Sequence, residues 1–461
     1  MKLKETRLAY LKELLLGGKY ESIQSEKPSF HPSEIANAIN SLPDNEQIKA
    51  FQVVHKSIWI NVFEYLGYDS QKNLLSQLSN DEIAIILTKM SPDDRTVFFS
   101  QLPGLELTKY MNLLHGEDKA EAHDLLGYAE NSIGRLMNTD FFSFRHDITI
   151  SKAIEQIRAE GKDNETLNMI YLTDAEGKLI DDIPLRRLLL HSPDKMMSEI
   201  MDHSFIRLNV NDKNEDAIKV FKEYDRVALP VVDDENILLG IVTIDDVLDV
   251  VEESDTQDIQ KFGGVESLDM PYAKTPLFEL VKKRAGWLVI LFLSEMLTAT
   301  AMGFFEDEIA KAVVLALFIP LIISSGGNSG SQAATLIIRA MALREITLKD
   351  WWKVMRKEIF SGLMLGGVLG SIGFLRILIW QNLYLYNYGE HWFLIGLTIS
   401  FTLVGIVMWG TISGSMIPFA LKRFKLDPAT SSAPFVATLV DVTGLIIYFT
   451  VASIILKGTL L

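Results

Sequence analysis

A lone carboxylate, Asp441, lies in the middle of the chain's last apolar segment. Residues 433–455 contain no other Asp, Glu, Lys, Arg or His. A charged side chain at the centre of a membrane span is costly, and such residues almost always face the interior of a helix bundle or a water-filled path. Asp441 is therefore expected to form an ion site. A buried, hydrogen-bonded structural aspartate is the alternative.

Small residues accompany Asp441 at helical spacing. Ala433, Ala437 and Gly444 recur with it along one narrow stripe, which leaves space beside the carboxylate. Mg²⁺ gives up its waters reluctantly and usually keeps several, so a roomy site with few protein oxygens suits hydrated Mg²⁺. Glu295 is a second acid within an apolar segment. A place on the ion path and a structural or peripheral role are both open for it.

A run of small and polar residues interrupts the apolar segment 309–341. It extends from Pro320 to Thr335 and includes Gly326-Gly-Asn-Ser-Gly-Ser-Gln332. Such a run permits either close helix packing or unwound backbone that lines a cavity. Taken alone the run favours packing, whereas together with Asp441 it is typical of a pore wall.

The densest charge in the chain immediately precedes the apolar part. Seven acids occur within fourteen residues, mostly at helical spacing: Asp245, Asp246, Asp249, Glu252, Glu253, Asp255 and Asp258. A solvated helix face is one explanation. The other is that divalent cations bridge these acids to further acidic elements, so that the position of the helix depends on ion concentration.

The elements that must position these residues fall into two parts of different composition. Residues 1–284 carry a net charge of −18 and residues 285–461 a net charge of +2. An acidic soluble part argues against nucleic acid as a partner and for cations. The chain has no Cys, which excludes disulfides and thiolate metal sites. Its eight His show no zinc-binding spacing and no nucleophile and base pair is visible, so an enzyme is not expected.

Five segments of the second part are long and apolar enough to cross a membrane. They comprise residues 285–305, 309–341 with its interruption, 359–380, 392–421 and 434–456. Basic residues precede the first, third and fifth of these segments, while the connection 306–308 is acidic and the connection 381–391 is rich in Tyr. By the positive-inside rule the chain is a multi-pass protein of the cell (inner or plasma) membrane, with its large N-terminal part in the cytoplasm.

Residues 134–255 contain an internal repeat with an offset of about 64 residues, in which each copy runs strand, helix, strand, turn, strand, helix. The second copy ends in Gly240-Ile-Val-Thr-Ile-Asp-Asp246 and resembles the paired cystathionine-β-synthase-type (CBS) module. In that module Thr243 and Asp246 match a hydroxyl and a carboxylate that contact a nucleotide, which makes ATP a candidate ligand. A turn and helix start is the alternative role for both residues. The first copy has Asp181, Pro184 and Arg187 at the equivalent positions.

Residues 1–132 are predicted to be all-helical. Helix starts such as His31-Pro-Ser-Glu34, Ser79-Asn-Asp-Glu82 and Ser91-Pro-Asp-Asp94 precede short apolar-periodic stretches. Starts at such short intervals predict a small helical superhelix.

These features together resemble the MgtE family of magnesium channels over nearly the whole chain. The most specific segments are 326–340, Asp427-Pro-Ala429 and 434–444, with Gly134-Arg-Leu-Met137 at the entry to the first repeat. The resemblance implies a multidomain homodimer in membrane lipid. Its subunit would have an all-α superhelical N domain (1–132), an α/β CBS-pair domain (133–250), a connecting helix (251–283) and a five-helix transmembrane pore domain (284–461).

The resemblance also assigns metal positions. In the pore, Asp441 would hold a hydrated Mg²⁺ with assistance from the backbone near Ala437. The family often has Asn where this chain has Ala433. Regulatory Mg²⁺ in the family bridges the N domain, the CBS pair and the connecting helix, and the matching acids in this chain are Asp93, Asp225, Asp246, Asp249, Glu252, Asp258 and Asp427.

The function that follows from the resemblance is a Mg²⁺-selective uptake channel closed by cytosolic Mg²⁺, which is both the permeant and the regulatory ion. Oxygen-only sites disfavour softer metals but exclude Mn²⁺ poorly. A transporter or channel for Mn²⁺ or Co²⁺ is therefore the first alternative. A membrane sensor or nucleotide-regulated enzyme, with the spans as an anchor, is the second.

Overall fold

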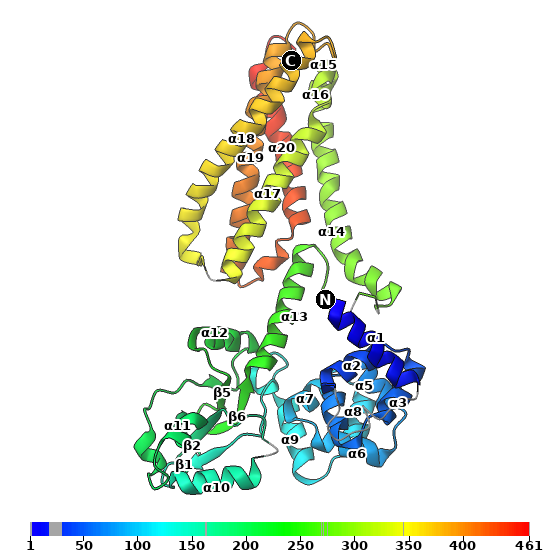
Figure 1. Cartoon of the computed structure of the whole chain (residues 1–461). Helices are drawn as coiled ribbons and strands as arrows, with labels where there is room; N and C mark the ends of the chain where they lie inside the picture. Colours follow the sequence, from blue (N-terminus) through cyan, green and yellow to red (C-terminus); the bar gives the residue numbers. More distant parts are fainter. Residues whose placement is uncertain are drawn as a thin grey trace. The chain divides into compact units, whose positions relative to one another are not determined.

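The computed structural model describes residues 2–17, 30–161, 164–268, 270, 272–273, 275–343 and 345–460. The chain divides into two compact units, Met1–Val251 and Glu252–Leu461. Figure 1 shows their elements, and each unit is described by itself.

The first unit begins with short helices at close intervals. They are α1 (Lys2–Gly17), α2 (Pro32–Asn40), α3 (Asp44–Val53), α4 (Trp59–Glu64), α5 (Tyr68–Leu75), α6 (Asn80–Lys89), α7 (Pro92–Ser100), α8 (Gly104–Met111) and α9 (Gly116–Gly127). The predicted starts of α2 and α6 are confirmed as capping boxes, His31 with Glu34 and Ser79 with Glu82. A shared apolar core that includes Phe51 holds the helices together.

Two similar three-stranded sheets follow, as the internal repeat predicts. The first contains β1 (Ser143–Arg145), β2 (Met169–Thr173) and β3 (Leu179–Pro184), with α10 (Ile150–Glu160) and α11 (Leu185–Leu190). The second contains β4 (Leu208–Asn209), β5 (Ala228–Val232) and β6 (Leu238–Thr243), with α12 (Asn214–Tyr224). In each sheet the first pair of strands is parallel and the second antiparallel. The two copies therefore share one topology.

The connecting helix is an extension of the second repeat. Helix α13 (Ile244–Phe262) starts directly after β6 and continues without a break past the predicted domain limit at residue 250. It ends at Phe262, twelve residues after that limit, whereas the connecting helix was predicted to extend to residue 283. Gly263 and Gly264 follow it, and Gly264 has φ +72°, a left-handed conformation that ends helices and suits glycine.

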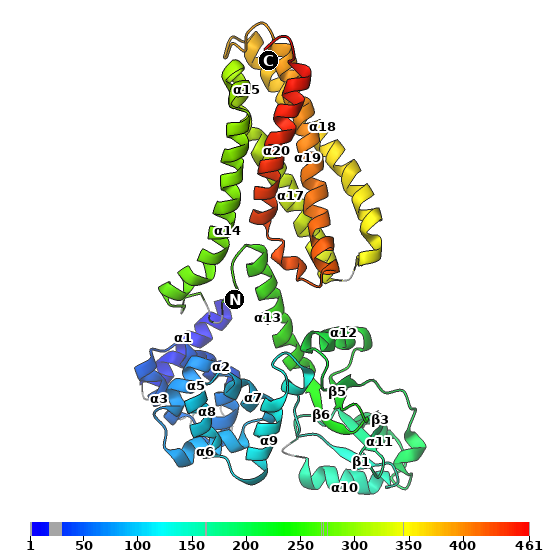
Figure 2. The ribbon, with the colours of Figure 1, turned by 180° about the vertical axis from the view of Figure 1, so that it is seen from behind.

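The second unit contains five helical segments long and apolar enough to span a membrane among the described residues. They are formed by α14 (Leu277–Phe304), α16 (Val313–Ala316) with α17 (Ile319–Ala342), α18 (Trp351–Asn382), α19 (Trp392–Arg423) and α20 (Ala433–Ile455), and α15 (Glu306–Lys311) connects the first two. The predicted number of spans is confirmed. Figure 2 shows α14 beside α20 and α17 next to α19.

The glycine-rich run is helical, so the unwound-backbone alternative is wrong and the packing alternative is right. Helix α17 is continuous from residue 319 to 342, and the breaks in this span lie earlier, at residue 312 and at residues 317–318, on either side of α16. A Cβ on Gly410 would lie 2.5 Å from the Gly326 carbonyl oxygen, and one on Gly414 would lie 2.0 Å from that of Gly330. Helices α17 and α19 thus touch through their backbones, a contact that only glycine permits.

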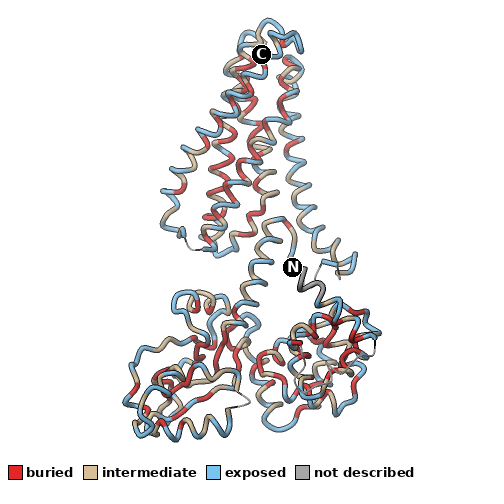
Figure 3. Tube along the Cα trace, viewed as in Figure 1, coloured by how far each residue is buried: buried red, intermediate tan, exposed pale blue. Residues whose placement is uncertain are grey.

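The membrane-spanning helices differ in how many of their side chains are buried. Helices α17, α19 and α20 contribute most of the buried side chains of the membrane unit, whereas in α14 only Thr298 is buried (Figure 3). An apolar helix with so little buried surface presents most of its side chains to lipid or to another chain.

Candidate functional site

Asp441 lies on α20 where that helix meets the glycine-rich face of α17. A Cβ built on Gly327 would lie 3.3 Å from the Ala437 Cβ and 3.5 Å from Asp441 Oδ1. The missing side chain of Gly327 therefore leaves space directly beside the carboxylate. The glycine-rich run and Asp441, which together predicted a pore wall, are neighbours in the structure.

The polar groups near Asp441 are bonded elsewhere. Ser331 Oγ donates to the Ala433 carbonyl oxygen at 3.2 Å, and Trp409 Nε1 donates to Thr443 Oγ1 at 2.8 Å. Within the described residues, the Asp441 carboxylate itself has no hydrogen-bond or ion-pair partner. A structural aspartate in a membrane interior needs such a partner, because an unpaired polar group there is costly. This geometry supports the ion-site interpretation over the structural one.

A second group of acids lies where α7 of the N-terminal helices meets the second repeat. We call it the interdomain acidic cluster: Glu64 at the end of α4, Asp93 and Asp94 in the first turn of α7, Glu165 before β2, and Asp246 in the first turn of α13. Asp93 is 5 % exposed. Asp93 and Asp246 were predicted as regulatory ligands, and the structure places them close enough to repel each other electrostatically.

Asn138 lies at the centre of the interdomain acidic cluster. Its Nδ2 donates to Asp93 Oδ1 and to Glu165 Oε2, both at 3.1 Å. Its backbone N–H and C=O pair with Ile241 of β6 at 2.8 Å each, and its side chain is fully buried. Asn138 thereby ties two acids from different elements to the edge of the second sheet.

The acids of the cluster raise one another's pKa values. Burial raises the pKa of Asp94 to about 8, with Asp93 and Glu64 as the next causes. Burial, and then Asp93, raise the pKa of Asp246 to about 8 and that of Glu165 to about 7. The buried Arg95 of α7 does not relieve them, because it is bonded to Glu121 and to the Leu87 carbonyl oxygen. Five carboxyl groups thus share a space in which a cation would be stabilised.

The cluster is not a preformed cage. Across the described ranges, no three His, Cys, Asp or Glu side chains are arranged to coordinate one metal ion directly. Mg²⁺ commonly keeps several waters and binds through one or two carboxylates. The donor set of carboxylates with an amide fits a hydrated Mg²⁺ better than a dehydrated or softer ion.

The remaining predicted regulatory acids are distributed along α12, α13 and the α19–α20 connection. Asp225 is exposed and ends α12 in a left-handed conformation with φ 51°. Asp249 and Glu252 are exposed on α13, and Asp258 is partly buried on the same helix. The structure does not gather these four residues at the interdomain acidic cluster.

The end of α13 is held by ion pairs within the second unit. Lys261 Nζ lies 2.9 Å from Asp427 Oδ2, and Arg339 Nη1 of α17 lies 3.8 Å from Asp255 Oδ1. Asp427 Oδ1 also accepts a hydrogen bond from the Ala429 N–H at 2.9 Å. Asp427, which was predicted as a regulatory ligand, thus lies beside the end of α13, where a lysine pairs with it.

Glu64, Asp94 and Glu165 were not identified from the sequence. They come from three separate elements, and no spacing in the chain links them. The adjacency of Asp94 to the predicted ligand Asp93, at a helix start, is the one signal that could have pointed to it.

Thr243 and Asp246, the candidate nucleotide ligands, bond to each other. Thr243 Oγ1 donates to Asp246 Oδ2 at 2.5 Å across the first turn of α13. A hydroxyl and a carboxylate three residues apart at a helix start can bond in this way without a ligand. It supports the structural alternative for this pair, and ATP binding stays a prediction.

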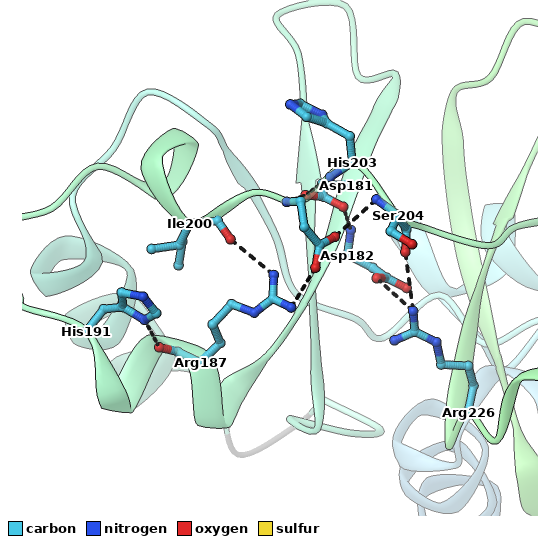
Figure 4. Close-up of polar contacts among 9 residues, drawn as sticks. Asp181, Asp182, Arg187, His191, Ile200, His203, Ser204 and Arg226 are labelled. Carbon is cyan, nitrogen blue, oxygen red and sulfur yellow. Dashed lines mark hydrogen bonds and ion pairs between the residues drawn. The ribbon is translucent and has the colours of Figure 1, made fainter.

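The equivalent positions of the first repeat form an internal polar network (Figure 4). Asp181, which is fully buried, accepts from the N–H groups of Asp202 at 2.9 Å and His203 at 3.1 Å. Arg187 donates to the Ile200 carbonyl oxygen at 3.1 Å and to Asp202 Oδ2 at 2.6 Å. These side chains serve the fold of the repeat.

Asp182 makes the stability of the first repeat depend on pH. Burial raises its pKa to about 6, against the attraction of Arg226 3.4 Å away. A raised carboxyl pKa contributes stability that is complete below about pH 4 and is lost as pH rises through about 6. We compare the exchange rates of the β2 and β3 amides in the wild type with those in Asp182→Asn at the same pH. We expect this ratio of rates, wild type to variant, to be about tenfold higher at pH 7 than at pH 4.

Hydrogen exchange in both proteins across this pH range tests the expectation, with Asp147→Asn as the control. Arg145 lowers the pKa of the exposed Asp147, so its contribution has the opposite pH dependence. Equal pH dependence of the wild type and Asp182→Asn would contradict the assignment.

Comparison with known proteins agrees with this architecture. Three family models match the chain: a divalent cation transporter, MgtE, over residues 319–451; the MgtE intracellular N domain over residues 30–131; and a CBS domain over residues 197–253. "Magnesium transporter MgtE" of Thermus thermophilus is 37% identical over 347 residues, which cover 75% of each chain. The protein of the same name from Enterococcus faecalis is 30% identical over 341 residues, which cover 74% of this chain and 73% of that one.

A solved structure described as the soluble part of a magnesium transporter also matches. It is 26% identical, with a TM-score of 0.51, and the match covers 54% of this chain and 99% of the other. Five apolar spans joined to a large soluble region with a CBS module define a multi-pass membrane protein of the cation-transporter class, and not an enzyme. The chain belongs to the MgtE family.

Proposed function

We propose that this chain carries Mg²⁺ into the cell along an ion path at Asp441. The relatives from T. thermophilus and E. faecalis are named magnesium transporters, which supports Mg²⁺ as the ion. The observation that carries the proposal is the unpartnered Asp441 carboxylate beside the space left by Gly327. A membrane potential negative inside favours entry of a divalent cation by about 4.6 kcal/mol per 100 mV, twice the single-charge value.

The ion path is proposed to be a channel that cytosolic Mg²⁺ closes. At low Mg²⁺ the carboxylates of the interdomain acidic cluster repel one another, which favours separation of α7 from the second repeat. At high Mg²⁺ a hydrated ion held by Asp93 and Asp246, with Asn138 orienting Asp93, stabilises their contact. Binding to one arrangement in preference to the other is what a shift in population requires.

The other acids are proposed to act in the same way through further ions. They are Asp225, Asp249, Glu252, Asp258 and Asp427. For Asp427 the ion would compete with Lys261, which pairs with it in the present arrangement. Ala437 is proposed to assist Asp441 through its backbone, and the four domain limits predicted from the sequence stay predictions.

The pore is proposed to form between two copies of the chain in membrane lipid. A dimer would account for the large exposed apolar surface of α14, which one subunit leaves without cover. Nucleotide binding at Thr243 and Asp246 is not needed for gating by Mg²⁺.

Mg²⁺ current in excised patches tests this function while cytosolic Mg²⁺ is stepped from about 1 µM to about 10 mM, a range that spans weak carboxylate sites. We expect the current to fall more steeply than the loss of driving force alone requires. Tracer uptake without current at any concentration would indicate a coupled transporter and contradict the channel. Larger currents with Mn²⁺ or Co²⁺ than with Mg²⁺ would favour the first alternative ion.

A further inference from the structure

A second acid, Glu295, lies at membrane depth and has no role in the function proposed above. It is at the centre of the predicted span 285–305, on α14, and its side chain is exposed. An ionised carboxylate at this depth is unfavourable against lipid and is found facing water or a bundle interior. The position of Glu295 therefore calls for an aqueous or protein-lined surface beside it.

Glu295 and Asp441 lie at nearly the same depth. Helices α14 and α20 run side by side in the same direction (Figures 1 and 2). At their outer ends Phe305 stacks on Phe449, with ring centroids 4.8 Å apart and an interplanar angle of 17°. Glu295 precedes Phe305 by ten residues and Asp441 precedes Phe449 by eight, so at 1.5 Å per residue both lie about 12–15 Å below the stacked rings.

Glu295 also lies next to the residues through which α14 packs against the rest of the membrane unit. Thr298, one turn further along, is the buried residue of α14, with 5 % exposure, and its Oγ1 has no hydrogen-bond partner among the described residues. Ala301 packs against the apolar core of the membrane unit. Residues three apart share a helix face, so Glu295 lies at the edge of this contact. The two carboxylates are close enough to act on each other electrostatically.

We propose that Glu295 is a second carboxylate of the ion path, which faces the same water-filled space as Asp441 and draws hydrated divalent cations towards it. The inference rests on the proposed role of Asp441. Two carboxylates at one depth bind the water shell of a divalent ion more strongly than one does. The unpartnered hydroxyl of Thr298 adds a polar group that water in this shell would satisfy.

The test is the dependence of Mg²⁺ current on external Mg²⁺ in the full-length protein. In Glu295→Gln we expect the concentration for half-maximal current to rise about tenfold, because the attraction of the ion is lost, while the saturating current stays unchanged. Glu295→Asp is expected to restore most of the affinity. Glu306→Gln is the matched control and should leave the curve unchanged, since Glu306 is an exposed acid at the start of α15, just after the same span.

Each of the other outcomes contradicts either the role proposed for Glu295 or the function proposed for Asp441. A wild-type curve in Glu295→Gln, with transport abolished in Asp441→Ala, removes Glu295 from the path and leaves the proposed function intact. Equal loss of saturating current per reconstituted protein in Glu295→Gln and Glu295→Asp would mean a structural role. An equal shift in Glu306→Gln would mean a general effect of surface charge. Transport that survives Asp441→Ala would remove the proposed function itself.

Discussion

Replacing Asp441 with alanine is expected to abolish Mg²⁺ transport, with a loss of at least about 100-fold. The carboxylate is the charged group of α20, and no hydrogen bond holds it within the described structure. Its contact with a divalent cation in a low-dielectric setting is worth several kcal/mol, and each 1.4 kcal/mol corresponds to about tenfold. Asp441→Asn should lose nearly as much, because the amide keeps the shape of the side chain but not its charge.

The measurement is Mg²⁺ flux into liposomes that contain equal amounts of purified protein. Thr450→Ala is the matched control, since Thr450 is an exposed polar residue of the same helix whose hydroxyl bonds to its own backbone at Ile446. Both variants should retain the oligomeric state of the wild type. Normal flux in Asp441→Ala, with the assembly intact, would refute the ion path at this residue.

Replacing both Asp93 and Asp246 with asparagine is expected to weaken the dependence of the current on cytosolic Mg²⁺. The current should change at both high and low Mg²⁺ concentrations. The variant loses two carboxylate ligands, so more current should persist at high Mg²⁺. It also loses part of the repulsion that raises the pKa values of the remaining acids Asp94 and Glu165, so less current should flow at very low Mg²⁺. The half-inhibiting Mg²⁺ concentration should rise about tenfold or more.

Patch currents across the same range of cytosolic Mg²⁺ measure both ends of this response. Asp124→Asn is the control, since Asp124 is 81% exposed on α9, outside the interdomain acidic cluster. A response that shifts at high Mg²⁺ alone would mean that repulsion within the cluster does not open the channel. An unchanged response would remove the cluster from gating altogether.

The features that could be predicted from the sequence are those that depend on residues close together in the chain. Apolar runs of spanning length specify the five membrane helices, because the thickness of the bilayer sets a minimum length. The lone charge at Asp441 is equally conspicuous, because a charged side chain within a membrane span is costly. The capping boxes at His31 and Ser79 are likewise local, since a cap and its partner are three residues apart.

The features that could not be predicted depend on tertiary contacts. Glu165 joins Asp93 through Asn138, which is paired to β6, and Glu64 reaches the start of α7 by accepting a hydrogen bond from the Ser91 N–H. The glycine-rich run left close packing and unwound backbone both open, and α17 is continuous through it. The backbone contact with α19 offsets the low helix propensity of glycine. That contact cannot be predicted from the sequence of α17 alone, because it depends on a second helix.

The backbone contact between α17 and α19 has a mechanical consequence. Because a Cβ on Gly414 would lie 2.0 Å from the Gly330 carbonyl oxygen, sliding either helix along the other would drive larger neighbouring side chains into the backbone. We therefore expect these two helices to move as one rigid body. Helix α14, whose buried residue is Thr298, is packed less tightly and is expected to shift more easily relative to that body.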